Sequence, residues 1–192
     1  MRFVILGSGT GSNAQALLRE WLAGNLGGAE PQGIISDQVD APILGHGPTF
    51  GLPAFHIDPG PFRTKLSPEA EQAYVEAIRQ LNADWVVLAG FMRVIKQPFL
   101  DAFPRRIINL HPSLLPSFKG LEAIRQAYEY GVRYTGCTVH YVTGELDGGP
   151  IIDQAVVPLE PEDTLLKLSE KVHAAEHQLL PAAIKKLAQI YS

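Results

Sequence analysis

The sequence predicts an α/β fold, with a mostly parallel, twisted sheet and helices on both faces. Three observations lead to this prediction. Short apolar runs recur along the chain, at Phe3–Leu6, Gly33–Ser36, Trp85–Ala89 and Arg106–Leu110. Amphipathic stretches of helical length separate several of these runs, which is the pattern of βαβ units. A glycine-rich segment also follows the first run directly, where Rossmann-like folds turn from a strand into a helix.

The first helices are expected over Ser12–Ala23 and Glu69–Leu81, where apolar side chains recur at three- and four-residue spacing. Between them, prolines interrupt every candidate element from Gly45 to Pro68. That region is therefore expected to consist of loops around one short strand at Ala54–Ile57.

The second half of the chain predicts two late strands and a closing helix. Thr135–Val142 alternates between two sets of side chains, and Pro150–Val157 follows it after a glycine-rich turn, so the two are expected to pair as strands, with an antiparallel arrangement as one option. A long helical pattern runs from Asp163 to Ile190. Pro181 lies inside it, which predicts a break or a kink because proline cannot donate a backbone hydrogen bond.

Length and composition indicate an ordinary globular protein. The 192 residues suit a single domain spanning 1–192, and a net charge of −4 without any cluster of Lys and Arg argues against nucleic acid as a partner. No apolar run is long enough for a signal peptide or a membrane span. The single cysteine, Cys137, fits a reducing cytoplasmic compartment.

The glycine-rich segment Gly7–Asn13 predicts a phosphate site. Glycines let the backbone approach a ligand closely, and free N–H groups at the start of a helix favour an anion. The dinucleotide fingerprint is matched imperfectly because Ser12 stands where its third glycine belongs, although Asp37 could imitate the ribose-binding acid. A purely structural turn stays open as the alternative.

Asn109 and His111 form the strongest candidate for chemistry. They end a predicted strand and alternate onto one side of it, at the edge where open α/β sheets bind ligands. Both side chains can donate hydrogen bonds to an oxygen that gains negative charge. Asp147 lies in the turn between the late strands, and a carboxylate beside an imidazole favours the charged imidazole and fixes its orientation. A helix cap with a satisfied core histidine, and an ordinary hairpin turn, are the structural alternatives.

The string His173-Ala-Ala-Glu176-His177 matches an inverted zinc-peptidase signature. We do not interpret it as a metal site, because no third ligand is apparent and Pro181 interrupts the helix that would supply one. A polar stripe facing solvent or a ligand is favoured instead.

Four segments together resemble one family. Gly7–Asn13, Leu88–Arg93, Asn109–Pro116 and Glu145–Pro150 occur in the order and at the spacing found in the phosphoribosylglycinamide formyltransferases. The resemblance runs through nearly the whole chain and implies a Rossmann-like formyltransferase fold. It implies a transferase of one-carbon metabolism that passes the formyl group of 10-formyltetrahydrofolate to the amine of glycinamide ribonucleotide in de novo purine biosynthesis, without a metal.

The resemblance also implies which residues act. It makes Asn109, His111 and Asp147 catalytic, and it assigns the ribonucleotide to the backbone of Gly11, Ser12 and Asn13 together with His173 and Glu176. The folate is assigned to Asn109 and to two segments, one formed by Met92, Arg93, Val94 and Ile95 and the other by Thr143, Gly144, Glu145, Leu146 and Asp147. A basic residue also touches the folate in this family, and Lys65 is chosen here over Arg63. The ribonucleotide half is expected at about 1–100 and the folate and catalytic half at about 85–192.

Two related families share the catalytic trio and differ from the phosphoribosylglycinamide formyltransferases in their additional domains. A formyltetrahydrofolate deformylase usually has an extra N-terminal domain, and a transfer-RNA formyltransferase has an additional C-terminal domain. A chain that opens at the first strand and closes on a helix favours neither, and the deformylase, a hydrolase, stays open as an alternative. An NAD-binding Rossmann module is the alternative from another class, and it predicts no role for the trio. Small-molecule substrates are the expected partners, and the sequence leaves a homodimer open.

Overall fold

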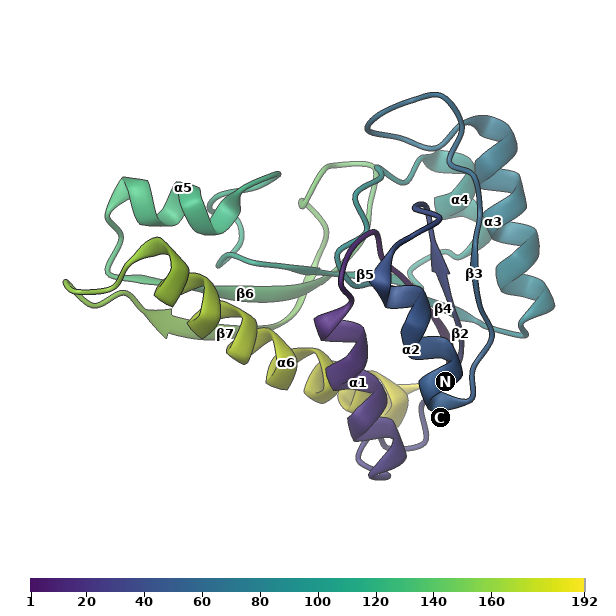
Figure 1. Cartoon of the computed structure of the whole chain (residues 1–192), viewed down its shortest axis with the longest axis horizontal. Helices are drawn as coiled ribbons and strands as arrows, with labels where there is room; N and C mark the ends of the chain where they lie inside the picture. Colours follow the sequence, from purple (N-terminus) through teal and green to yellow (C-terminus); the bar gives the residue numbers. More distant parts are fainter. Residues whose placement is uncertain (192) are drawn as a thin grey trace.

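A seven-stranded sheet forms the centre of the molecule in the computed structural model, which describes residues 1–191 (Figure 1). The strand order is β3-β2-β1-β4-β5-β6-β7. The pairs within β1–β5 are parallel, whereas β6 runs antiparallel to both β5 and β7. The bounds of the strands are β1 (Arg2–Leu6), β2 (Glu30–Ser36), β3 (Ala54–His56), β4 (Trp85–Leu88), β5 (Ile107–His111), β6 (Tyr134–Tyr141) and β7 (Ile151–Pro158).

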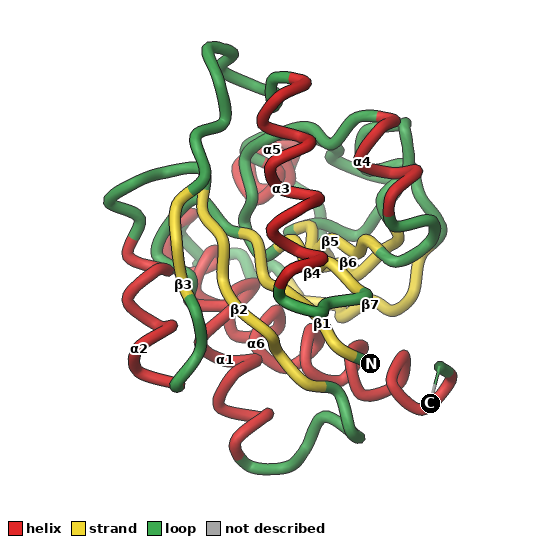
Figure 2. Tube along the Cα trace, turned by 90° about the vertical axis from the view of Figure 1, so that its right-hand side faces the viewer, coloured by secondary structure: helices red, strands yellow, loops and turns green. Residues whose placement is uncertain are grey.

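Helices cover both faces of this sheet, as expected, and Figure 2 shows α1 and α6 on the opposite side from α3 and α4. The alternation of β1 explains the two layers. Phe3 and Ile5 belong to the core that includes α1 and α6, whereas Val4 and Leu6 belong to the core that includes α3 and α4. The bounds of the helical elements are α1 (Ser12–Leu22), η1 (Pro42–Gly45), α2 (His46–Phe50), α3 (Pro68–Gln80), α4 (Gln97–Ala102), α5 (Ala123–Tyr130) and α6 (Leu165–Ile190).

The region Gly45–Pro68 is more ordered than the sequence predicts. The short strand is present as β3, but the expectation of loops before it is wrong, because α2 occupies His46–Phe50. Pro48 is the third residue of this helix. A proline is tolerated in the first turn, since the N–H groups there have no partner within the helix.

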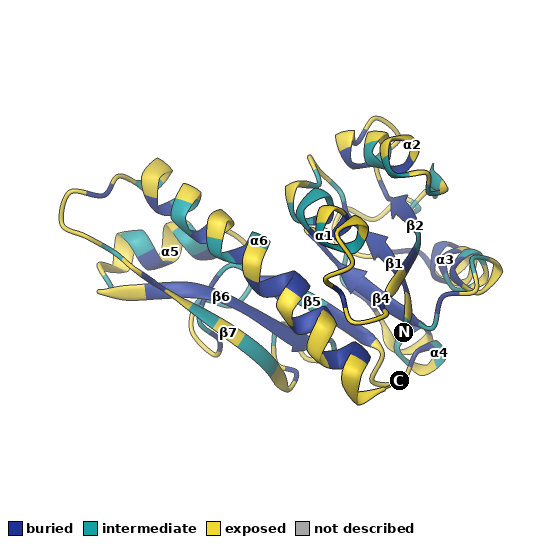
Figure 3. Ribbon diagram, turned by 90° about the horizontal axis from the view of Figure 1, so that it is seen from below, coloured by how far each residue is buried: buried dark blue, intermediate teal, exposed yellow. Residues whose placement is uncertain are grey.

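The expected break at Pro181 is also wrong. α6 continues from Leu165 to Ile190 with Pro181 inside it. A proline inside a helix costs about 3 kcal/mol. Leu179, Leu180 and Ala183 are buried around Pro181, and burying one leucine side chain stabilises the fold by roughly 1.5–3 kcal/mol. Packing against the sheet therefore holds the helix through the proline, and Figure 3 shows buried segments of α6 lying along the strands.

The register of the central strands brings three chain segments to one edge of the sheet. Leu6 pairs with Leu88, and Leu88 pairs with Asn109. The segments that follow β1, β4 and β5 therefore leave the sheet side by side, at the carboxyl edge where open α/β sheets bind ligands. Within residues 1–191, no helix combines the length and apolar character needed to cross a membrane.

Candidate active site

Asn109, His111 and Asp147 come together at this edge, as the sequence predicts. Asn109 and His111 lie on β5, and Asp147 lies in the loop between β6 and β7. His111 Nδ1 is 3.5 Å from Asp147 Oδ2, with both side chains less than a tenth exposed. A short-range ion pair between two buried groups is little screened by solvent. The loop between β6 and β7 therefore places the carboxylate of Asp147 beside the imidazole of His111.

His111 faces an oxygen acceptor at each ring nitrogen. Nδ1 faces Asp147, and Nε2 lies 2.9 Å from the carbonyl oxygen of Phe118. A carbonyl can only accept, so Nε2 carries a hydrogen. Both ring nitrogens therefore face protein acceptors, and donation to an oxyanion requires one of them to exchange its acceptor for that oxygen.

The loop after β5 has an unusual backbone where it reaches the site. Phe118 has a φ of 54° and Glu122 a φ of 58°, and Asp147 opposite them has a φ of 48°. Non-glycine residues with positive φ are uncommon and cluster at functional sites. The conformation is held by two contacts between the loops: Gly120 N donates to Asp147 Oδ2 at 2.8 Å, and Lys119 pairs with Glu145 at 2.7 Å.

His140, on β6, is a site residue that the sequence reasoning missed. Its Nε2 is 3.2 Å from Asn109 Nδ2 and 3.7 Å from Asp147 Oδ1, and the residue is 2% exposed. Burial lowers the pKa of His140, although a backbone hydrogen bond at Tyr141 and the Asp147 carboxylate act in the opposite direction. The pairing of Asn109 with His140 depends on the β5–β6 register. The alternating pattern around His140 indicates the strand, but not its register with β5.

The glycine-rich turn opens α1 as expected. Gly11 is the residue before the helix, with a φ of 76°, and Ser12 and Asn13 begin the first turn. A Cβ at Gly11 would lie 2.5 Å from Ile43 Cγ1, so glycine is needed here for packing as well as for backbone conformation. The turn is therefore a structural requirement whatever it binds.

Asn13, His173 and Glu176 meet beside this turn. Asn13 Nδ2 donates to Glu176 Oε2 at 3.0 Å, and His173 Nδ1 is 2.9 Å from the same oxygen. The hydrogen bond to Glu176 raises the pKa of His173, while burial opposes the shift. Asn13 Oδ1 is buried without a hydrogen-bond partner in the protein. A buried amide oxygen without a partner is costly unless a ligand or water satisfies it.

The segment Met92–Ile95 lies against residues 62–65. Val94 N donates to the carbonyl of Thr64 at 2.8 Å, and Lys65 forms an isolated parallel bridge with Val94. Lys65 therefore lies next to the segment that is expected, like Lys65 itself, to contact the folate. Its Nζ lies 4.3 Å from the centre of the Phe62 ring.

Arg93 and Asp37 form a buried ion pair beneath this segment. Arg93 Nε is 2.6 Å from Asp37 Oδ2, and Arg93 Nη1 also donates to the carbonyls of Phe62 and Arg63. Burial raises the pKa of Asp37, but hydrogen bonds from Ser8, Arg93 and Gln38 outweigh it, so the net shift is downward. Asp37 is therefore occupied inside the protein, which removes the residue that the NAD-binding alternative needs.

The zinc-like string on α6 lies beside the glycine-rich turn. Residues 1–191 contain no group of three or more His, Cys, Asp or Glu side chains placed to hold a metal ion. Glu176 instead bonds to Asn13 and His173. The string therefore contributes side chains to the polar cluster beside the glycine-rich turn.

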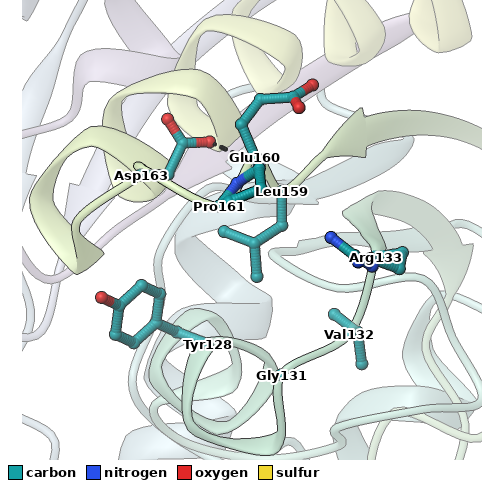
Figure 4. A pocket seen from close by; sticks show the side chains of 8 residues that line it. All are labelled: Tyr128, Gly131, Val132, Arg133, Leu159, Glu160, Pro161 and Asp163. Carbon is teal, nitrogen blue, oxygen red and sulfur yellow. Dashed lines mark hydrogen bonds between the residues drawn. The ribbon is translucent and has the colours of Figure 1, made fainter.

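Two surface pockets lie apart from Asn109, His111 and Asp147. One of about 200 Å³, seen in Figure 4, lies where α5 ends and α6 begins, and Asp163 Oδ2 accepts a hydrogen bond from Glu160 N on its wall. The other, of about 460 Å³, lies beside the loop after β5, with Phe118 and Tyr134 among its lining residues. Neither is lined by Asn109, His111 or Asp147.

Comparison with known proteins gives one consistent result. Residues 1–184 match the family described as formyl transferase. The phosphoribosylglycinamide formyltransferase of Bacillus subtilis is 36% identical, over 97% of this chain and 94% of that protein. The human trifunctional purine biosynthetic protein adenosine-3 is 40% identical over 97% of this chain, which spans 18% of that longer protein.

Solved structures show the same similarity. The crystal structure of glycinamide ribonucleotide transformylase 1 from Symbiobacterium toebii superposes with a TM-score of 0.92 at 44% identity, covering 98% of this chain and 88% of that one. Phosphoribosylglycinamide formyltransferase from Bacillus halodurans gives 0.90 at 40% identity, covering 97% of this chain and 95% of that one. The fold expected from the sequence is confirmed.

Proposed function

Because the chain belongs to the formyl transferase family, we propose that it transfers the formyl group of 10-formyltetrahydrofolate to the amine of glycinamide ribonucleotide. The single observation that carries the proposal is the cluster of an amide, an imidazole and a carboxylate at the carboxyl edge of the sheet. Asn109 and His111 come from β5 and Asp147 from the loop after β6, and His111 lies 3.5 Å from the carboxylate. Transfer of a formyl group to an amine uses both kinds of group in this cluster. The amide and the imidazole can donate hydrogen bonds to an oxyanion, and the carboxylate can take part in moving the proton of the amine.

The ribonucleotide site of the proposal lies at the start of α1. The backbone N–H groups of Gly11, Ser12 and Asn13 would hold the phosphate, since they begin a helix and its dipole favours an anion. Glu176 and His173 would contact the sugar or the amine end. The unpartnered Oδ1 of Asn13 supports this assignment, because it leaves an acceptor to be satisfied beside that carboxylate.

The formyl donor of the proposal lies across two segments. One contains Met92, Arg93, Val94 and Ile95, and the other contains Thr143, Gly144, Glu145, Leu146 and Asp147. Met92 and Leu146 are each 57% exposed, which offers apolar surface to a planar ring. Because the guanidinium of Arg93 is engaged inside the protein, Arg93 would contribute through its backbone. Lys65 is the proposed basic contact, with Arg63 as the alternative.

The proposed chemistry is direct attack of the ribonucleotide amine on the formyl carbon. As the amine adds, Asn109 donates a hydrogen bond to the oxygen that gains negative charge, and His111 donates a second one once its Nε2–H exchanges the carbonyl of Phe118 for that oxygen. Asp147 stabilises the charged imidazole and relays, through water, the proton that the amine loses. That proton goes to the folate nitrogen, which leaves as its bond to the formyl carbon breaks. The thiol of Cys137 is buried, and burial raises its pKa to about 12, so it is a poor nucleophile. The proposal therefore includes no formylated protein residue and no metal.

The remaining parts of the proposal follow from the same assignment. Residues of about 1–100 would form the ribonucleotide half of a single domain, and about 85–192 the folate and catalytic half. The partners would be small molecules, and the compartment would be the cytoplasm, where purine synthesis supplies the ribonucleotide.

The test is dependence of the reaction on the amine. The pure protein is incubated with 10-formyltetrahydrofolate with and without glycinamide ribonucleotide, and release of tetrahydrofolate is followed. The proposal predicts release that requires the ribonucleotide and persists after exhaustive chelation. Equal release without it would identify a deformylase, and activity restored only by zinc would show that the metal was wrongly left out.

A further inference from the structure

His140 lies against the back of the candidate active site with both ring nitrogens in defined contacts. Its Nδ1 is 2.9 Å from the backbone carbonyl of Tyr141, and its Nε2 is 3.2 Å from Asn109 Nδ2. The residue is buried on β6, opposite Asn109 of β5 in the antiparallel pairing. The ring therefore contacts one member of the proposed catalytic trio directly through a hydrogen bond.

The two contacts together define the tautomer of His140. A carbonyl oxygen can only accept, so Nδ1 must carry the hydrogen that it shares with Tyr141. In a neutral ring the other nitrogen, Nε2, is then an acceptor. Asn109 donates to this nitrogen through Nδ2, and the same Nδ2 carries a second hydrogen that remains for a substrate oxygen.

The charge state of His140 decides which way the amide of Asn109 points. A protonated Nε2 would be a donor, and the amide would have to turn its oxygen toward the ring. That would move the amide nitrogen to the other side of the group. A neutral His140 therefore keeps the N–H donors of Asn109 on the side of the amide that faces His140 and Asp147. The Oδ1 atom of Asp147 lies 3.7 Å from Nε2 of His140.

Three titratable neighbours act on this ring from the elements packed around it. Asp147, in the loop after β6, favours the charged form, whereas His111 on β5 and Lys119 in the loop after β5 disfavour it. Burial is the largest influence, and it lowers the pKa of His140. The neutral form is therefore the one present at neutral pH, in agreement with the geometry of the hydrogen bonds.

We propose that His140 is a positioning residue that acts through Asn109, holding the side-chain amide with its N–H donors toward the formyl oxygen. The inference rests on the proposed function, since the formyl oxygen is the group that the amide would meet. It makes His140 a supporting member of the site and leaves contact with the reacting atoms to Asn109.

Two substitutions separate this role from simple packing. His140→Gln places an uncharged acceptor, Oε1, at the same number of bonds from Cβ as Nε2, and His140→Leu fills the space without an acceptor. His140→Leu should lower kcat by about tenfold or more while the KM values change by less than about threefold, because ground-state binding does not use the oxyanion donor. His140→Gln should recover most of the loss. Equal losses in the two variants would overturn the proposal.

A double-mutant cycle shows whether the effect passes through Asn109. Asn109→Ala is expected to lower kcat by on the order of a hundredfold. If His140 acts through that amide, adding His140→Leu to Asn109→Ala should cost less than about twofold further. Losses that multiply would contradict the proposal.

Nitrogen-15 NMR of histidine-labelled protein tests the tautomer without substrate. The proposal predicts a neutral ring for His140 with the hydrogen on Nδ1, assigned by loss of the signals in His140→Gln. A hydrogen on Nε2, or a charged ring at neutral pH, would overturn it. Failure of formyl transfer by the unaltered protein would refute the proposed function, while this spectrum would still report on His140.

Discussion

Replacing Asp147 with asparagine removes one charge from the site with little change in shape. The side chain is 8% exposed, and the backbone has a φ of 48°, which asparagine tolerates well. Asparagine can also still accept the hydrogen bond from Gly120 N. We therefore expect Asp147→Asn to fold normally, so that any loss of rate reflects the missing carboxylate.

The separation of the charged groups sets the size of the effect. For unit charges on His111 Nδ1 and Asp147 Oδ2, 3.5 Å apart, Coulomb's law at an effective dielectric of about 20 gives roughly 5 kcal/mol. This is a ceiling, because burying the pair costs part of it. Loss of about 3–4 kcal/mol of transition-state stabilisation corresponds to a fall in kcat of about a hundred- to a thousandfold.

The assay is steady-state kinetics of tetrahydrofolate release with both substrates varied. Asn109→Ala and His111→Ala should also lower kcat heavily, and each of the three variants should bind both ligands within about tenfold of the unaltered protein. Because the residues act as one unit, His111→Ala combined with Asp147→Asn should cost much less than the product of the single losses. A near-normal rate for Asp147→Asn, or effects that multiply, would refute this division of roles.

Three further predictions test other parts of the molecule. Ser12→Asp should stabilise α1, because an acidic side chain is favourable at a helix N-terminus, yet it should raise the KM for the ribonucleotide by about tenfold or more through repulsion of the phosphate. Ser12→Ala should change this KM by less than about threefold, and equal effects of the two variants would contradict a phosphate at this turn. Arg93→Met should lower the free energy of unfolding by about 3 kcal/mol in a denaturant titration, because it leaves the buried carboxylate of Asp37 without its ion-pair partner. Arg125→Met, which removes two exposed ion pairs, should cost less than about 1 kcal/mol, and similar losses in the two variants would show that the buried pair is unimportant. The hydrogen bond to Glu176 raises the pKa of His173 in the folded state, so the stabilisation from this bond should be complete below the ordinary pKa of 6.5 and be lost as the pH rises through the raised pKa. The difference in unfolding free energy between the unaltered protein and His173→Gln should therefore be larger at about pH 5.5 than at about pH 8.5, and a difference that grows with pH would contradict this expectation.

The parts of the fold that repeat a simple pattern could be predicted from the sequence. The buried strands around Val4 and Val86 read as continuous apolar runs because both faces of the sheet are covered. α2 and the unbroken α6 could not be predicted, since both tolerate prolines for reasons of position and packing. Local propensity gives no information on the buried leucines around Pro181.

The same distinction holds for the candidate site. Asn109 and His111 are two positions apart at the end of a readable strand, so their placement together could be inferred. His140 could not, because its contact with Asn109 depends on the register of β5 with β6. The role of Arg93 was also hidden, because its partner Asp37 is 56 positions away in the chain and the pairing depends on how the strand ends meet.

The fate of the formyl carbon tests the central claim most directly. The donor is labelled with carbon-13 in its formyl group and incubated with the protein and glycinamide ribonucleotide, and the products are separated and weighed by mass spectrometry. The account predicts that the label appears in the ribonucleotide and that little free formate forms. Label recovered as formate, with the ribonucleotide unchanged, would contradict it.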